Sequence, residues 1–298
     1  MPSWSDVLEE MHAVQPHPTD KVRRKYLGNL HRHTKRNVIA YYSGWLSSKP
    51  NQALIVNDED KNAFMASIHK LDRSKGLDLL LHTPGGDLAA AESLVDYLRR
   101  MFGTDIRAIV PQLAMSAGTM IACSCKEIVM GKQSNLGPID PQFNGLPANG
   151  VIAEFKQAID EVKKDPSKAI IWQAIIGKYH PTFLGTCQKA IEWAQAIVNT
   201  WLTTGMLHGV HNSSEIAKNI VEGLSSHDAT YNHARHIHIE ELEGLGLKIT
   251  RLEDDPKLQD LVLTVHHAFM HTFSMTRAIK IVENHMGVGV VRFVSPNS

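Results

Sequence analysis

Short apolar runs that alternate with helical patterns constrain the fold of this chain more than any other feature of its sequence. Each run is too short for a helix and is bounded by turn residues, which is typical of a buried strand. The runs lie at residues 76–82, 105–111 and 127–130. Apolar residues at helical spacing separate them, and such alternation across short links predicts right-handed crossovers. The sequence therefore indicates an α/β fold with a mainly parallel sheet.

Residue composition and periodicity divide the 298 residues of the chain into three parts. Residues 1–36 are polar and basic and predict an N-terminal helical arm. Residues 37–252 form the main domain, which opens on a strand and becomes helical in its later part. Residues 253–298 form a C-terminal helix and tail. There we expect a long helix over 258–279, and the apolar pattern of 287–294 is compatible with a final strand.

Charge and cysteine content exclude several classes of protein. Lys plus Arg and Asp plus Glu both number 31, so the chain has no electrostatic basis for coating nucleic acid or anionic lipid. No run of about 18 apolar residues indicates a membrane span, and the N-terminus lacks the pattern of a secretion signal. Three cysteines without framework spacing favour reduced thiols. We therefore expect a cytoplasmic protein without a nucleic-acid partner.

The first junction that can carry chemistry is the end of the strand at residues 80–87 (LLHTPGGD). Consecutive glycines, here Gly85 and Gly86, let the backbone take conformations barred to other residues and let another chain approach closely. A free Gly86 N–H at such a turn is well placed to donate to an oxyanion. A plain strand-to-helix turn, with Asp87 as an acid at the helix start, explains the same residues equally well.

The second junction lies at residues 111–122, where Ser116 is followed by Ala117, Gly118 and an apolar helix. This pattern places the Ser116 hydroxyl at a helix N-terminus, where the dipole and unpaired N–H groups favour developing negative charge. The small neighbours leave room for a substrate carbonyl. Serine is also a favoured helix N-cap, so a purely structural role is the plainer interpretation.

The order of the elements brings the two junctions together. Each follows a strand of the same alternating run, and the carboxyl ends of parallel strands meet at one edge of the sheet, where ligands bind. The N–H groups of Gly86 and Ala117 are then expected to flank one carbonyl oxygen beside Ser116. A nucleophile with two oxyanion donors is the minimal site for acyl transfer.

Three motifs follow one another along the chain, at residues 83–86 (TPGG), 115–119 (MSAGT) and 134–142 (SNLGPIDPQ). In this order they resemble the Clp/crotonase superfamily. They are most similar to the serine dehydrogenase proteinase family, a relative of signal peptide peptidase A and the Clp protease subunit. The segments 179–183 and 233–247 are similar to that family as well.

This resemblance, which spans residues 37–252, carries expectations about fold and activity. It implies a ClpP/crotonase-like ββα-spiral core with a helical C-terminal region, serine peptidase activity on a peptide or protein substrate, and a homo-oligomer. By the same resemblance Ser116 matches the nucleophile, and Gly86 and Ala117 match the oxyanion pair, with Gly85 supporting the loop.

The general base is where this sequence departs from the Clp subunit. That subunit has a histidine in the segment matching residues 136–141, whereas here the segment holds Asp140 and no histidine. Signal peptide peptidase A uses a lysine further downstream. The candidates are Lys168, Lys178 and, by type, His180, because a lysine must be desolvated to act near neutrality whereas histidine titrates there already. Lys178 and His180 rank equally, and Lys168 follows because its segment is more polar.

Asp140 has two interpretations. In the first, Asp140 orients the base or binds a backbone amide near the substrate. In the other it is a turn aspartate beside Pro138 and Pro141, and we favour this role.

Histidine is unusually frequent, with 17 copies, and invites a metal hypothesis. His233, His236 and His238 lie close together, with His227 and Asp228 nearby. A zinc site needs three or four converging ligands, but residues 236 and 238 share a face only on a strand, and residues 233 and 236 only on a helix. No HExxH or CxxC pattern occurs. We therefore expect no metal and no cofactor, and a surface or interface role for this segment.

The sequence thus predicts a serine peptidase in which Ser116 attacks a peptide carbonyl and a base near residues 178–180 takes its proton. One alternative is a crotonase-like enzyme that uses the same two amides on the enolate of an acyl-coenzyme A thioester. A serine at position 116 favours the peptidase, because enolate chemistry needs no nucleophile there. The other alternative is a non-catalytic interaction subunit, which the lack of an unambiguous base allows.

Overall fold

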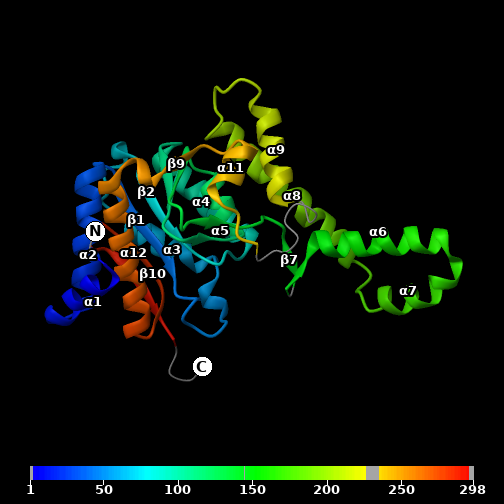
Figure 1. The fold of residues 1–298 in the computed structure, drawn as a ribbon, viewed down its shortest axis with the longest axis horizontal. Coiled ribbons are helices and arrows are strands. Elements are labelled where there is room, and N and C mark those ends of the chain that lie inside the picture. The colour runs from blue at the N-terminus through cyan, green and yellow to red at the C-terminus, as the bar shows by residue number, and fades with distance from the viewer. Residues whose placement is uncertain (1–2, 144, 226–234, 295–298) are drawn as a thin grey trace.

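The computed structural model describes residues 3–143, 145–225 and 235–294. Its centre is a seven-stranded sheet, in which β1, β2, β3, β5 and β9 run parallel and β10 and β11 are antiparallel to their neighbours (Figure 1). The predicted α/β fold with a mainly parallel sheet is confirmed. In spatial order the strands are β11 (Gly289–Phe293), β10 (Ala278–Asn284), β1 (Asn37–Ser43), β2 (Leu77–His82), β3 (Ile106–Val110), β5 (Glu127–Met130) and β9 (Ile249–Arg251).

Helices cover both faces of the sheet. One face packs against α3 (Glu59–Ile68), α4 (Leu88–Phe102) and α5 (Ala117–Cys123), and the other against α1 (Trp4–Ala13), α2 (Pro18–Thr34) and α12 (Pro256–Met275) (Figure 1). Side chains of β1 alternate between the two cores, with Tyr41 in the first and Tyr42 in the second. Strands buried on both faces have continuous apolar sequences, which is why the short runs predicted them.

The C-terminal segment departs from its predicted elements. The helix expected over 258–279 ends at Met275 as α12, and residues 278–284 form β10 instead. Two charged residues, Lys280 and Glu283, interrupt the apolar pattern of this strand and hid it from sequence reasoning, although both side chains are buried. The final strand is present as β11.

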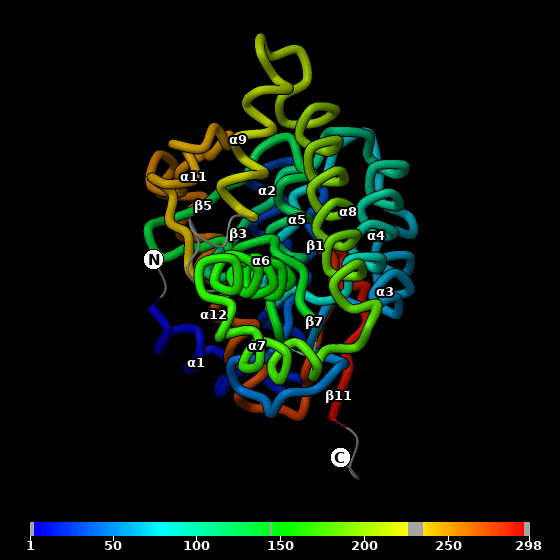
Figure 2. The backbone as a smooth tube through the Cα atoms, turned by 90° about the vertical axis from the view of Figure 1, so that its right-hand side faces the viewer, coloured from blue at the N-terminus to red at the C-terminus, as the bar shows by residue number. Residues whose placement is uncertain are grey.

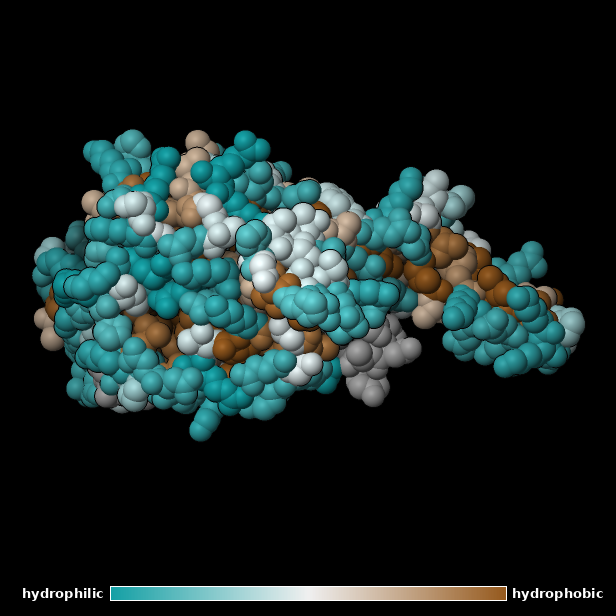
Figure 3. Space-filling view, turned by 90° about the horizontal axis from the view of Figure 1, so that it is seen from above, coloured by the Kyte–Doolittle hydropathy of each residue, from teal (hydrophilic) through white to brown (hydrophobic). Residues whose placement is uncertain are grey.

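A helical hairpin formed by residues 148–176 projects from the body of the molecule and points toward the viewer in Figure 2. Apolar side chains lie along it in Figure 3, and Ile170 and Ile171 are 76% and 61% exposed. In the described ranges, no helix has the length and hydropathy needed to cross a bilayer. The hairpin consists of α6 (Ala148–Lys164), η3 (Pro166–Lys168) and α7 (Ala169–Ile176), and it leads into α8 (Phe183–Thr204), α9 (Ser213–Ser225) and α11 (Ile239–Leu245).

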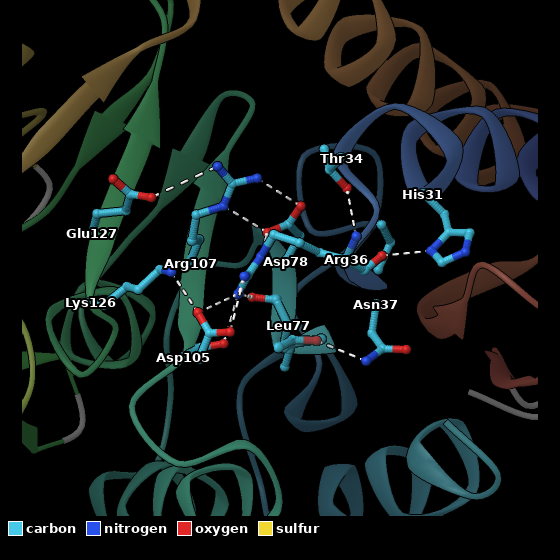
Figure 4. A network of polar contacts seen from close by, with 12 residues as sticks. His31, Thr34, Arg36, Asn37, Leu77, Asp78, Asp105, Arg107, Lys126 and Glu127 are labelled. Atoms are coloured by element: carbon cyan, nitrogen blue, oxygen red, sulfur yellow. Dashed lines mark hydrogen bonds and ion pairs between the residues drawn. The ribbon is translucent and has the colours of Figure 1, made fainter. Parts of the chain in front are cut away.

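Ion pairs hold the sheet edge at which the parallel strands begin (Figure 4). The fully buried Asp78 of β2 accepts hydrogen bonds from Arg36 Nε at 2.7 Å and from Arg107 Nε at 2.8 Å. Arg36 also donates to Asp105, which pairs with Lys126. A buried carboxylate requires such partners. The network is therefore a structural feature of the edge at which the strands begin, opposite the edge that carries the candidate site.

Candidate active site

The two glycines after β2 are required by close packing. Gly85 and Gly86 have φ angles of 93° and 156°. A Cβ on Gly85 would lie 2.6 Å from the Cβ of Ser116, and a Cβ on Gly86 would lie 2.4 Å from the backbone N of Val56. No side chain tolerates such distances, so the loop meets both the Ser116 turn and the Val56 segment with bare backbone.

An isolated bridge to Val56 sets the direction of the Gly86 amide. Val56 N donates to Gly85 O at 2.8 Å, and Asp87 N donates to Val56 O at 2.9 Å. In this parallel pairing the bonds pass through the residues that flank Gly86, so its own N–H points away from Val56. Asp87 caps α4, since its Oδ1 accepts a hydrogen bond from Ala90 N at 2.8 Å.

Ser116 has a backbone conformation that is rare for a residue with a side chain. Its φ is 52° and its ψ is −118°, and such strain persists only where the surrounding structure enforces it. It directly precedes α5, yet its hydroxyl makes no capping hydrogen bond. A serine N-cap, the structural alternative, therefore does not account for this residue.

Gly86, Ser116 and Ala117 line one pocket of about 870 Å³. Much of the remaining lining is apolar and includes Met120 and Trp193. A second pocket of about 420 Å³ lies beside it, because Gln52, Ile55 and Pro84 line both. Its other lining residues are Trp45, Ser48, Pro50, Asn51 and Leu54.

Two backbone amides at this pocket lack an acceptor within the part of the chain that the structure describes. Among the residues that the structure describes, neither Gly86 N nor Ala117 N donates a hydrogen bond to another protein group. Ala117 is the first residue of α5, so its amide is one of the donors that every helix start leaves unpaired. Gly86 is half-buried and Ala117 is buried, and a carbonyl oxygen in the pocket would supply an acceptor for both amides.

The third motif supports the Ser116 turn. The short strands β4 (Leu113–Ala114) and β6 (Asn135–Leu136) pair in parallel beside it. Thr119 Oγ1 donates to Ala114 O at 2.8 Å and accepts from Gly137 N at 2.9 Å. A Cβ on Gly137 would lie 2.6 Å from the terminal methyl of Met115. Gly137 thus packs closely on the turn, with no room for a side chain.

The three candidate bases lie on or next to the projecting hairpin, and none of them lines the pocket of Ser116. Lys168 Nζ is bonded to Glu161 Oε2 at 3.2 Å. Lys178 is exposed after α7, and His180 is exposed with its Nδ1 3.1 Å from Thr182 Oγ1. The structure of one chain therefore does not bring a sequence-predicted base to the nucleophile.

Asp140 is buried where the chain enters α6. Its Oδ1 accepts hydrogen bonds from Asn149 N at 3.2 Å and from Asn149 Nδ2 at 2.9 Å. Next to it, Ala148 N donates to Pro141 O at 2.8 Å and closes the small hairpin of β7 (Gln142–Phe143) and β8 (Leu146–Pro147). Asp140 thus contacts the first turn of α6, and its predicted turn role stays a prediction.

A cluster of polar rings lies at the end of β2, and its two histidines, His82 and His266, are buried. The ring of His82 lies 5.2 Å from that of His266 on α12 and 4.4 Å from that of Trp45. Within the described ranges, neither nitrogen of His82 nor Nδ1 of His266 has a hydrogen-bond partner. Burial lowers the pKa of His82 well below its ordinary range and the pKa of His266 to about 3. Both rings are therefore neutral near pH 7.

Part of the histidine-rich segment, including His227, Asp228 and His233, lies outside the described residues. In the rest of the chain, no three His, Cys, Asp or Glu side chains are arranged to hold a metal ion. The three cysteines, Cys123, Cys125 and Cys187, are free and buried.

Several site residues were missed by sequence reasoning. Val56, which orients Gly86, and Trp45 and Trp193, which line the pockets, lie far from the motifs in the sequence. Nothing in the pattern of residues 45–56 signals this role, because the bridge to Gly86 is a single long-range contact.

Comparison with known proteins places the chain in a family. A family model described as ClpP-like SDH-type serine proteinase matches residues 21–257. Two uncharacterized proteins of Methanocaldococcus jannaschii are 32% and 26% identical to this chain over 191 residues, or 64% of its length. The matched parts are 59% and 58% of those proteins, so the chain spans less than two thirds of either.

A solved structure is also similar. It is a mutant of the 1510-N membrane-bound stomatin-specific protease, with 16% identity, a TM-score of 0.41, and coverage of 70% of this chain and 79% of that one.

Proposed function

Because the chain belongs to the ClpP-like SDH-type serine proteinase family, we propose that it is a serine peptidase and that Ser116 is its nucleophile. The observation that carries this proposal is the Ser116 turn. A strained, uncapped serine shares a pocket with two amides that have no acceptor among the described residues. This is the arrangement that acyl transfer needs and that a structural serine does not.

The proposed reaction runs through an acyl-enzyme. The Ser116 oxygen attacks the carbonyl carbon of the scissile bond, and a base takes the hydroxyl proton. The N–H groups of Gly86 and Ala117 donate to the oxyanion of the tetrahedral intermediate. When this intermediate collapses, the C–N bond breaks and the protonated amine leaves. Water then attacks the ester and releases the acid and the free serine.

We infer that the base reaches Ser116 from a neighbouring copy of the chain. Lys168, Lys178 and His180 all lie at the projecting hairpin, away from the pocket lining of their own chain. The hairpin exposes Ile170 and Ile171, and covering such apolar side chains favours association. A homo-oligomer in which the hairpin contacts the next body would pair each nucleophile with a partner's base.

The test of the nucleophile is covalent labelling by a fluorophosphonate probe. Wild-type protein is expected to be labelled, Ser116→Ala is expected to lose labelling entirely, and Ser93→Ala on α4 is the matched control that keeps it. A folded wild-type protein without labelling contradicts the proposal. That outcome favours the non-catalytic interaction subunit, and retention on a coenzyme A resin would favour the crotonase-like alternative.

A further inference from the structure

β10 carries two buried charged side chains, Lys280 and Glu283, which are 1% and 2% exposed. Because they are three positions apart on a strand, they point to opposite faces of the sheet. Glu283 accepts hydrogen bonds from Arg23 and Arg24 of α2, at 3.0 Å and 2.9 Å. Lys280 points to the other face, toward α3 and the segment that leads into it.

The Lys280 ammonium group has three oxygen partners. Its Nζ donates to Asp60 Oδ1 at 2.9 Å, to Asp60 Oδ2 at 3.0 Å and to the Ile55 carbonyl at 2.6 Å. Asp60 also accepts from the Tyr41 hydroxyl at 2.6 Å and from Asn57 N at 3.0 Å. The ion pair thus binds the carbonyl of Ile55 and the amide of Asn57, the two peptide groups on either side of Val56.

Val56 is the residue that pairs with the glycine loop. Its N–H donates to Gly85 O, and its carbonyl accepts from Asp87 N. The outer groups of the segment 55–57 are therefore held by the ion pair, and the inner groups hold the loop. The direction of the Gly86 N–H depends on this pairing, so it depends on the position of residues 55–57.

We propose that Lys280 and Asp60 are positioning residues for the peptidase reaction, because their ion pair holds residues 55–57 so that the Gly86 N–H meets the developing oxyanion. This inference rests on the proposed function. Lys280 lies beyond residues 21–257, the part of the chain that matches the family. The C-terminal segment therefore supplies a residue that acts on the active-site loop through two successive sets of hydrogen bonds. The first joins the ion pair to residues 55–57, and the second joins Val56 to the glycine loop.

The test compares two double variants that each remove one buried ion pair of β10. Lys280→Met/Asp60→Asn removes the pair that faces the loop, and Arg23→Met/Glu283→Gln is the matched control on the other face. Neutralising both partners avoids a lone buried charge, so both variants are expected to fold. Circular dichroism and thermal unfolding verify that each one does.

The kinetic readout is the split between kcat and KM on a peptide substrate. Lys280→Met/Asp60→Asn is expected to lower kcat about 100-fold, the scale of a misplaced oxyanion donor, while KM changes less than about twofold. The control variant keeps the wild-type kcat. A wild-type kcat in the Lys280/Asp60 variant, or an equal loss in both variants, overturns the proposal.

A second readout does not need activity. Hydrogen exchange of a peptide covering residues 83–90 is expected to speed up about tenfold in Lys280→Met/Asp60→Asn, because Asp87 N loses its fixed acceptor, and to stay unchanged in the control. If the wild type neither labels nor cleaves, the proposed function fails, and exchange alone then decides whether the ion pair holds the loop. Unchanged exchange in both variants overturns the positioning role.

Discussion

Ser116 and Gly86 have backbone conformations that neighbouring groups impose on them. Ser116 has a positive φ of 52°, and Gly86 lies against the backbone of Val56 with no room for a Cβ. Strain of this kind is maintained only when the rest of the fold stabilises it, and it concentrates at functional sites. At the residue scale, the site is therefore most sensitive to added bulk at the loop.

A methyl group at Gly86 tests this sensitivity. Gly86→Ala places a Cβ 2.4 Å from Val56 N, so the loop must move and the Gly86 N–H with it. We expect the rate of fluorophosphonate labelling to fall about 100-fold, and the free energy of unfolding to fall by about 1–3 kcal/mol through overpacking.

Gly103→Ala is the matched control for this substitution. Gly103 also has a positive φ, of 61°, but a Cβ there meets no atom within 4 Å. Its ψ of −139° places it outside the left-handed helical region. Gly103→Ala is expected to cost about 1–3 kcal/mol through backbone strain alone and to leave the labelling rate unchanged. Equal labelling rates in the two variants would show that the loop does not need bare backbone at Gly86.

At the scale of elements, β2 and α12 meet through buried neutral histidines directly below the active-site loop. His82 ends β2, one residue before Thr83, and its ring contacts His266 of α12 and Tyr42 of β1. Two other titratable rings lie at this contact. Burial raises the pKa of the Tyr42 phenol well above its ordinary range. His267 lies 6.2 Å from His266, and burial lowers its pKa as well. The described residues supply no carboxylate to this cluster through a hydrogen bond or an ion pair.

The stability of this contact is expected to depend on pH. The pKa of His266 is about 3 in the folded chain against an ordinary value of 6.5, so the unfolded state binds more protons between these values. The contribution of the neutral His266 ring to the free energy of unfolding is fully present above about pH 6.5 and is lost as the pH falls toward 3. Urea unfolding should show a loss of about 1.6 kcal/mol from His266 alone between pH 6.5 and 5.

His266→Phe is expected to flatten this dependence by removing one of the titrating rings. His69→Gln, at the exposed end of α3, is the control and should keep the wild-type slope. An identical slope in wild type and His266→Phe would show that His266 does not titrate on unfolding.

At the scale of the whole molecule, the projecting hairpin separates the candidate bases from the nucleophile of the same chain (Figure 1). Mixing inactive subunits tests whether a neighbour supplies the base. Ser116→Ala keeps the hairpin, and the triple variant Lys168→Ala/Lys178→Ala/His180→Ala keeps the nucleophile. Each is expected to be inactive alone. In an equal mixture about half of the subunits keep the nucleophile, and about half of their neighbours keep the bases. About one quarter of wild-type activity should therefore be recovered.

No recovery in the mixture, with exchange of subunits verified, would mean that the base acts within one chain. Full activity of the triple variant alone would exclude all three candidates as the base.

The sequence was informative where a structural choice is local. The apolar runs that became β2, β3 and β5 are buried on both faces, so their composition alone predicts them. The junctions at Gly86 and Ser116 follow those strands directly, and parallel strands bring their ends to one edge. β10 was missed because its charged residues, Lys280 and Glu283, pair with partners more than 200 positions away.

The α/β architecture and the convergence of Gly86, Ser116 and Ala117 follow from the sequence, because both depend on short-range periodicity and on the direction of successive strands. The strain at Ser116, the pairing of Val56 with the glycine loop and the separation of the hairpin from the pocket depend on contacts between distant segments. Such contacts form only once folding has offset the entropy of closing long loops, and no local pattern of residues records them.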